Sequence, residues 1–295
     1  MARPVTTPAA IDAQELEELR NLVEQRTGVL FDASRERLLA ARVREHLQER
    51  RLAHASDLLR LVRCSHLEFE ALLERLLDRD SAFFCCPDLF HALEEKVLPD
   101  LHMRKFWESP RALRVWSAGC GTGEEPYSIA ITLADALEFE EAWNLSILAS
   151  DISRQALQHA ERGVYSRRQL VPLPSRHLEN YFARIGDQFL IKPRIRNLIH
   201  FAPMNLVQGG YLGRFDCIFC MHVLSSFSPE RRAALVQRFY DCLEPGGYLF
   251  LGPSEEGAAA PAGFESVFHR EARFYRRPGE GFPQRAAVAA PERRL

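Results

Sequence analysis

Three glycines at alternate positions, between an apolar run and a pair of glutamates, form the part of this chain best suited to bind a cofactor. The stretch covers residues 115–128 and reads Val-Trp-Ser-Ala-Gly-Cys-Gly-Thr-Gly-Glu-Glu-Pro-Tyr-Ser. Its apolar start predicts a buried strand, and its glycines allow the positive φ and close backbone approach that a ligand loop needs. The helix predicted to follow adds a positive dipole end. The sequence therefore predicts a nucleotide-cofactor loop.

The glycine spacing narrows the choice of cofactor. It does not match the G-x-G-x-x-G pattern of dinucleotide sites, and no G-K-[ST] follows it for a triphosphate, so NAD and ATP are disfavoured. S-adenosylmethionine fits better, because its methionine end needs short polar contacts and Glu124 or Glu125 can face its positive charge. The alternative is a structural strand-to-helix turn that binds nothing.

Two polar residues extend the predicted site. Asp151 follows the apolar stretch 145–150, at the sheet edge where open α/β folds bind ligands, and is predicted to accept both ribose hydroxyls. Asp151 or Ser153 can also cap the next helix, and the two roles are compatible. Asn205 is a candidate for the adenine edge, although a loop asparagine is commonly a turn former.

From residue 111 onward, predicted apolar strands alternate with predicted helices, and these elements must position the site residues. This alternation predicts an α/β fold with a parallel sheet and right-handed crossovers. Between residues 163 and 197 the rhythm breaks, and the apolar run 189–191 beside Gly186-Asp187 predicts a small antiparallel insertion. Strands are predicted at 113–117, 145–150, 199–201, 215–220 and 247–252, and helices at 126–137, 154–162 and 229–242.

The first part of the chain has a different pattern. Residues 12–78 carry leucines at helical spacing and predict a small all-helical domain. A linker with a helix (79–110), a main domain (111–278) with its insertion at about 165–198, and a disordered tail (279–295) are predicted to follow. Segment 34–51 is basic, and is either a solvated helix face or a docking surface for an acidic partner. Its charges are Arg35, Arg37, Arg42, Arg44, Arg50 and Arg51 against Glu36, Glu45 and Glu49.

Composition excludes several classes of protein. The chain has 295 residues, 46% of them apolar, and a formal net charge of −2, which gives no global reason to bind nucleic acid. No run approaches the roughly 18 apolar residues of a membrane span, so a cytoplasmic protein without membrane insertion is expected. The seven scattered cysteines predict reduced, mostly buried thiols. On a strand, Cys217 and Cys220 would point to opposite faces, so no metal site is predicted.

These residues resemble the chemotaxis receptor methyltransferases (CheR-type), which transfer a methyl group from S-adenosylmethionine to glutamate side chains on receptor helices. The resemblance covers roughly residues 12–277, and segment 116–128 is its most specific part. It implies a small all-helical N-terminal domain, then a Rossmann-like S-adenosylmethionine methyltransferase domain with an antiparallel β insertion. Supporting stretches are Ala149-Ser-Asp151-Ile-Ser153, Gly163-Val-Tyr165, Tyr181-Phe182, Arg196-Asn-Leu-Ile-His-Phe201, Asn205-Leu206 and Gly252-Pro-Ser-Glu255.

The resemblance also implies roles for individual residues. A chemoreceptor-like signalling protein would dock on the basic helix around Arg42 and Arg44. S-adenosylhomocysteine would be the product. The positions matching the family's substrate-positioning residues are Ser81, Cys85 and Ser226. Those matching its cofactor contacts are Ser81, Ala118, Gly119, Gly121, Glu125, Asp151, Asn205, Leu206 and His222.

The chain departs from the family where the substrate would be held. The family's Thr-x-Phe-Phe-Arg is here Ser81-Ala-Phe-Phe-Cys85, and Met221, His222 and Ser226 stand where arginine, asparagine and tyrosine are usual. An arginine and a tyrosine hydroxyl suit the positioning of a carboxylate for attack on the methyl group.

Several functions therefore stay open beside the favoured one, a protein-glutamate O-methyltransferase. Another residue, such as Arg79 or His222, can approach the substrate, or the accepted nucleophile can differ. The chain can instead be a catalytically impaired sensor or scaffold that binds S-adenosylmethionine and docks on a receptor or signalling partner. The basic helical domain argues against a fourth possibility, methylation of a small molecule.

Overall fold

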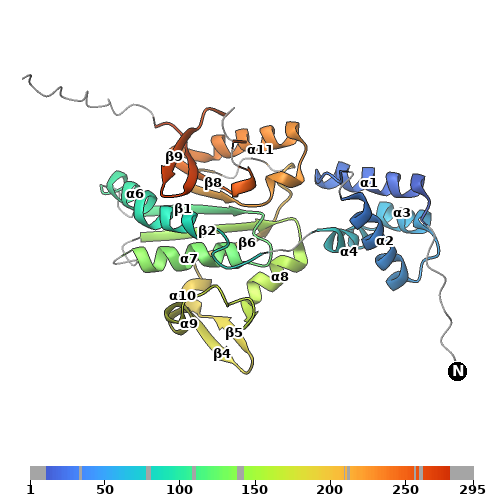
Figure 1. The fold of residues 1–295 in the computed structure, drawn as a ribbon, viewed down its shortest axis with the longest axis horizontal. Helices are drawn as coiled ribbons and strands as arrows, with labels where there is room; N and C mark the ends of the chain where they lie inside the picture. The colour runs from blue at the N-terminus through green and yellow to red at the C-terminus, as the bar shows by residue number, and fades with distance from the viewer. Residues whose placement is uncertain are drawn as a thin grey trace, which may run out of the picture.

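The computed structural model describes residues 11–32, 35–77, 81–107, 111–137, 143–208, 210, 213–255, 257–258 and 262–279. Arg79 and residues 280–295 of the predicted disordered tail lie outside these ranges. A small helical domain lies at one end of a larger α/β domain, and a small β-sheet projects from the larger domain (Figure 1). No helix of the described residues is both long and apolar enough to cross a membrane.

The N-terminal domain is all helical, as the leucine spacing predicts. The first helix stops at Gly28, which takes a φ of 82° and whose N–H donates to the Glu24 carbonyl. Asp32 Oδ1 accepts from the Arg35 N–H at 3.1 Å and so fixes the start of the second helix. The helices are α1 (Ala13–Thr27), α2 (Glu36–Arg50), α3 (Ala55–Cys64) and α4 (His66–Leu76).

The α/β domain contains a seven-stranded sheet in the order β6-β2-β1-β7-β8-β10-β9. The first five strands in this order are parallel, while β10 is antiparallel to both β8 and β9. The β9–β10 pair is not predicted from sequence, because β9 exposes most of its side chains and shows no apolar alternation. The strands are β1 (Arg111–Ala118), β2 (Trp143–Asp151), β6 (Ile199–Pro203), β7 (Phe215–Cys220), β8 (Leu243–Leu251), β9 (Glu265–His269) and β10 (Ala272–Arg276).

Strand β8 begins earlier than the predicted strand 247–252. Phe215 is paired with Leu243, but Cys217 is paired with Tyr248, so β8 carries extra residues between the two pairs. The segment Glu244-Pro-Gly-Gly247, whose composition is typical of a turn, lies within this irregularity and forms a bulge in the strand.

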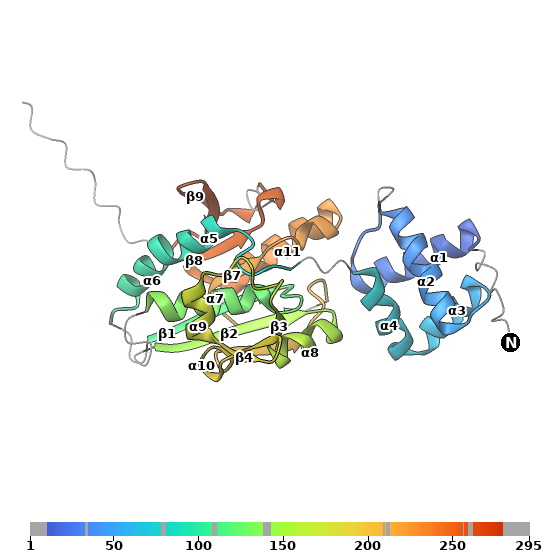
Figure 2. The ribbon, with the colours of Figure 1, turned by 60° about the horizontal axis from the view of Figure 1, so that its bottom comes forward.

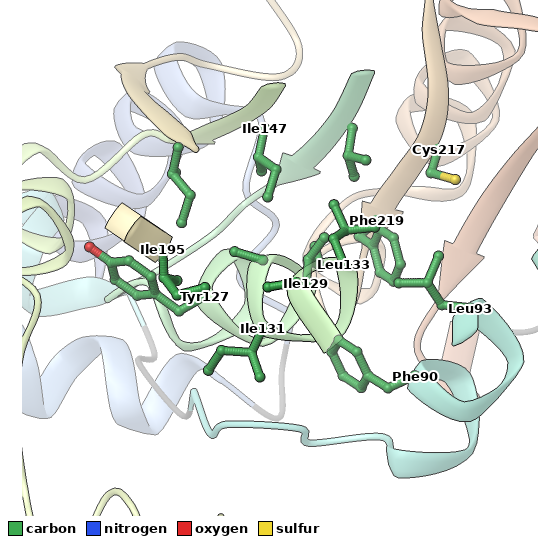
Figure 3. Packing of buried hydrophobic residues seen from close by; sticks show 14 of the residues in the cluster. Phe90, Leu93, Tyr127, Ile129, Ile131, Leu133, Ile147, Ile195, Cys217 and Phe219 are labelled. Atoms are coloured by element: carbon green, nitrogen blue, oxygen red, sulfur yellow. The ribbon is translucent and has the colours of Figure 1, made fainter. Parts of the chain in front are cut away.

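Helices cover both faces of the sheet and bury two apolar clusters. Cys217 belongs to one cluster and Cys220 to the other, which confirms that the two side chains point to opposite faces. Figure 3 shows the first cluster, with Ile129 of α7, Phe90 of α5 and Phe219 of β7 among its members. The remaining helices are α5 (Pro87–Ala92), η1 (Leu93–Val97), α6 (Leu98–Arg104), α7 (Glu124–Ala136), α8 (Arg154–Arg162), η3 (Leu224–Ser226), α11 (Pro229–Cys242) and η4 (Pro253–Glu255).

The predicted insertion is a three-stranded antiparallel sheet in the order β3-β5-β4. Figure 2 shows it beside α8, on the side of the α/β domain away from α11. Its elements are β3 (Val164–Ser166), α9 (Ser175–Tyr181), β4 (Phe182–Ile185), β5 (Gln188–Ile191) and the short helix α10 (Pro193–Arg196).

Two carboxylates of α4 join the helical domain to the start of α8. Glu74 accepts from the Gln155 N–H at 3.0 Å and from the Ser153 hydroxyl at 2.6 Å. Glu70 pairs with Arg154 at 2.7 Å. Negative charge at the positive end of a helix dipole is stabilising, so these contacts hold the helical domain at the carboxyl edge of the parallel strands.

Stacked phenylalanines between β7, β8 and β10 should stabilise the sheet measurably. The Phe219 and Phe250 rings lie 4.2 Å apart and nearly parallel, and Phe274 stacks on Phe250 at 5.3 Å. Phe219→Ala should lower the free energy of unfolding by about 3–5 kcal/mol, measured by urea titration. Phe268→Ala, at a 64% exposed position of β9, is the control and should change it by less than about 0.5 kcal/mol. Equal effects would contradict this assignment of the core.

Candidate active site

A cavity of about 190 Å³ lies at the carboxyl ends of β1 and β2, and the helical domain forms part of its wall. All but one of the predicted site residues line it. Ala118 is the exception, because it is fully buried as the last residue of β1, and the chain reaches the cavity wall only at the following Gly119. The predicted residues on the wall are Ser81, Cys85, Gly119, Gly121, Glu125, Asp151, Asn205, Leu206, His222 and Ser226.

The glycine turn needs its glycines for a steric reason. Gly119 has a φ of 84°, and a Cβ added there would lie 2.4 Å from Val223 Cγ2. Gly121 has a φ of 53°, and its N–H donates to Asp151 Oδ2 at 2.9 Å. The turn therefore presents bare backbone to the cavity and is tied to the end of the neighbouring strand.

Asp151 lies on the wall while Ser153 caps α8. Ser153 Oγ accepts from the Ala156 N–H at 2.9 Å, so of the two capping candidates Ser153 is the one that caps. Asp151 Oδ1 accepts from the Ser153 N–H at 2.8 Å. Both Asp151 oxygens thus hold backbone N–H groups, one in the glycine turn and one at the start of α8.

Only one of the two glutamates after the glycines faces the cavity. Glu124 turns away and accepts from the Thr122 hydroxyl at 2.6 Å and from Gln169 Nε2 at 3.2 Å. Glu125 lines the cavity and accepts from the Ser117 hydroxyl at 2.6 Å.

Burial raises the pKa of Glu125 to about 8. The nearby Cys86 and Glu255 raise this pKa further, and the Ser117 hydrogen bond opposes them. The carboxyl group is therefore largely protonated near neutral pH, and a cation bound in the cavity would favour its charged form.

The Asn205 amide is engaged within the protein. Its Nδ2 donates to the Arg26 carbonyl at 2.9 Å, and its Oδ1 accepts from the Val207 N–H at 3.1 Å. Asn205 thus forms a turn and ties this turn to α1. The turn is the alternative role that the sequence left open for Asn205. The two hydrogen bonds use the same amide group that was expected to meet an adenine edge.

Ser226 on the cavity wall is contacted by an arginine that the sequence did not single out as a site residue. Arg35 Nη1 donates to Ser226 Oγ at 3.4 Å, and the neighbouring Leu30 N–H donates to the Ser226 carbonyl at 2.7 Å. The only sequence signal for Arg35 was its place in the basic segment 34–51.

Cys86 is a second residue that the sequence did not single out. Its Sγ lies 3.8 Å from His222 Nε2. A hydrogen bond from Cys85 lowers the pKa of Cys86 to about 6, and His222 acts in the same direction, whereas the pKa of Cys85 is raised. All seven cysteines are free, and four are buried, in agreement with the sequence.

Comparison with protein families agrees with this geometry. Residues 79–272 match the family described as "CheR methyltransferase, SAM binding domain", and residues 14–77 match "CheR methyltransferase, all-alpha domain". The chain belongs to the CheR methyltransferase family. It is an S-adenosylmethionine-dependent methyltransferase, and the cofactor, enzyme class and domain types predicted from sequence are confirmed.

Individual members of the CheR family are similar to this chain over most of its length. The "Chemotaxis protein methyltransferase" of Vibrio parahaemolyticus is 31% identical over 88% of this chain and 96% of its own length. The "Chemotaxis protein methyltransferase 1" of Pseudomonas aeruginosa is 28% identical over 86% and 94%. Among solved structures, N-methyltransferase NodS from Bradyrhizobium japonicum matches with a TM-score of 0.35 and 13% identity, over 66% of this chain and 94% of that one.

The buried Glu125 should make the ligand-free protein less stable at higher pH. Its pKa in the folded protein, about 8, exceeds the ordinary 4.5, so its contribution to stability falls as pH rises from 4.5 through 8. Glu125→Gln keeps an acceptor for Ser117 and should raise the melting temperature above wild type by more at pH 8 than at pH 5. Calorimetric melting checks this, with the exposed Glu179→Gln as the control. A Glu125→Gln effect that is the same at both pH values would contradict it.

Proposed function

We propose that this protein transfers the methyl group of S-adenosylmethionine to glutamate carboxylates of a chemoreceptor-like protein in the cytoplasm, releasing S-adenosylhomocysteine. The observation that supports this most strongly is a single cavity that brings two chemically different groups together. The glycine turn, Asp151 and Glu125 line it, and so does Ser226, which Arg35 of the helical domain contacts.

The glycine turn, Asp151 and Glu125 suit the cofactor. The bare backbone at Gly119 and Gly121 can approach the methionine part, and the Asp151 carboxylate on the same cavity wall can accept hydrogen bonds from the ribose hydroxyls. Glu125 offers a negative charge to the cationic ligand once its proton is released. Leu206 and His222 also line the cavity.

The reaction needs positioning more than proton transfer. A glutamate is ionised near neutral pH, so its oxygen can attack the methyl carbon directly. The new oxygen–carbon bond forms while the carbon–sulfur bond breaks, and the electron pair stays on sulfur. The protein must hold the carboxylate oxygen about 3 Å from the methyl group and in line with sulfur.

Arg35 can supply the positive charge that Cys85 lacks. Its guanidinium donates to Ser226, which lines the cavity, and an arginine holds a carboxylate well because its N–H groups can donate in parallel. Ser81 lies beside the glycine turn, within 4 Å of the position that a Cβ on Gly121 would take. In our proposal Ser81, Cys85 and Ser226 surround the reacting atoms, and Arg35 holds the carboxylate.

The basic helix α2 is the proposed docking surface. It starts beside Arg35, which contacts Ser226 of the cavity wall, and with a rise of 1.5 Å per residue Arg44 lies roughly 13 Å farther along its axis. Arg42 and Arg44 are both exposed, and Arg42 pairs with Glu45 only at the surface, at 3.3 Å. A receptor helix with acidic residues that binds there would have its glutamates within reach of the cavity.

Transfer of labelled methyl groups tests the proposed reaction. Wild-type protein, labelled S-adenosylmethionine and the cytoplasmic domain of a chemoreceptor should give base-labile label on receptor glutamates, located by mass spectrometry. Arg35→Ala should lower kcat/KM by about 10-fold or more, because a charge-assisted hydrogen bond contributes about 1.5–3 kcal/mol. Arg35→Lys should recover part of this loss.

Two results would contradict the proposal. Cofactor binding without label on any receptor domain would favour a sensor or scaffold. Label that resists base would indicate a different nucleophile. An unchanged rate in Arg35→Ala would contradict the role of this residue alone.

Charge reversal on α2 tests the docking surface. Arg42→Glu combined with Arg44→Glu should raise KM for the receptor domain several-fold and leave cofactor affinity unchanged, because exposed charges mainly govern encounter. The effect should shrink at high salt. The control is Arg60→Glu, on the exposed surface of α3 in the same domain. An equal effect of the control on KM would argue against α2 as the surface.

A further inference from the structure

Cys85, Cys86 and His222 bring three metal-binding atoms together at the cavity wall. One ligand atom from each residue lies within 4.8 Å of the other two, and Cys86 Sγ is 3.8 Å from His222 Nε2. Cys85 and His222 line the cavity, and Cys86 is half-buried beside them. The expectation of no metal, drawn from Cys217 and Cys220, did not consider this cluster.

The backbone before the cysteines is held in an unusual conformation. Phe84 has a φ of 51°, and its N–H donates to Ser128 Oγ of α7 at 3.0 Å. A bulky side chain rarely adopts this region, so surrounding contacts must hold it there. This fixed turn directs the consecutive Cys85 and Cys86 toward His222.

The histidine is fixed from the opposite side. His222 also has a positive φ, 63°, and its N–H donates to the buried carboxylate of Glu255 at 2.9 Å. Its ring lies against Gly252, where an added Cβ would be 3.2 Å from both Cε1 and Nδ1. With Nδ1 against this backbone, Nε2 is the ring nitrogen left to face Cys86.

We propose that Cys85 Sγ, Cys86 Sγ and His222 Nε2 bind a Zn²⁺ ion. Zinc bonds of about 2.3 Å to sulfur and 2.0–2.1 Å to nitrogen put tetrahedral ligand atoms roughly 3.5–3.8 Å apart. The Cys86–His222 pair already has this separation, and the third atom needs only a small side-chain adjustment. Thiolate and imidazole ligands favour Zn²⁺ over Mg²⁺ and Ca²⁺, which prefer oxygen ligands.

Three protein ligands leave the fourth zinc position open. Because Cys85 and His222 face the cavity, this position also faces it, and a water or a carboxylate oxygen can bind there. The zinc site depends only on these three side chains, so the zinc proposal is independent of which substrate the enzyme methylates.

Metal titration of the full chain tests the site. The protein, kept reduced with a phosphine and freed of metal, is titrated with Co²⁺, which gives thiolate charge-transfer absorption, and then with Zn²⁺ in competition with a chromophoric chelator. Wild type should bind one ion. Cys86→Ser and His222→Asn should each weaken binding by about 10-fold or more; asparagine is chosen because it tolerates positive φ. Cys64→Ser, an exposed cysteine on α3, should bind like wild type.

The outcomes are distinct. Loss of thiolate–cobalt absorption in Cys86→Ser and His222→Asn, with melting temperatures near wild type, supports the site. Wild-type binding no tighter than that of both variants overturns it, as does an equal loss in Cys64→Ser. Because the readout is metal binding, failure here would leave the methyl-transfer proposal intact.

Discussion

The hydrogen bond from the Gly121 N–H to Asp151 Oδ2 is the contact on which the site depends most. It joins the turn after β1 to the end of β2, and the second oxygen of the same carboxylate holds the Ser153 N–H at the start of α8. One side chain thus fixes two loops at the sheet edge. The glycines matter for the same reason, because a side chain at Gly119 would displace the turn from this position.

The second constraint is closure of the cavity by the helical domain. Glu70 and Glu74 bind the start of α8, and an isolated antiparallel bridge joins Val29 to Phe227 at the cavity wall. The helical domain therefore forms part of the cavity wall in addition to carrying the proposed docking surface. Since Arg35 lies at this junction, a partner bound to α2 would lie close to the reacting groups.

The sequence predicted those features of the fold and of the site that depend on local residue patterns and on the general geometry of parallel sheets. Strand β7 and helices α8 and α11 have the predicted bounds, because their apolar periodicity is clear. The convergence of Gly119, Gly121 and Asp151 followed from the shared carboxyl edge of parallel strands. The proposed role of Arg35 could not be predicted, because its contact with Ser226 joins residues 191 positions apart and depends on domain packing. The contacts of Cys86 with His222 and of Asn205 with Arg26 also join distant residues, whereas the turn at Asn205 was an alternative that the sequence offered.

Calorimetric titration with S-adenosylhomocysteine tests most directly whether the glycine turn and Asp151 form the cofactor site. Wild type should bind one equivalent. Asp151→Asn removes the negative charge but keeps a similar shape, and should bind about 10-fold or more weakly while melting near the wild-type temperature. No binding by wild type, or equal binding by the variant, would contradict the assignment of this edge as the cofactor site.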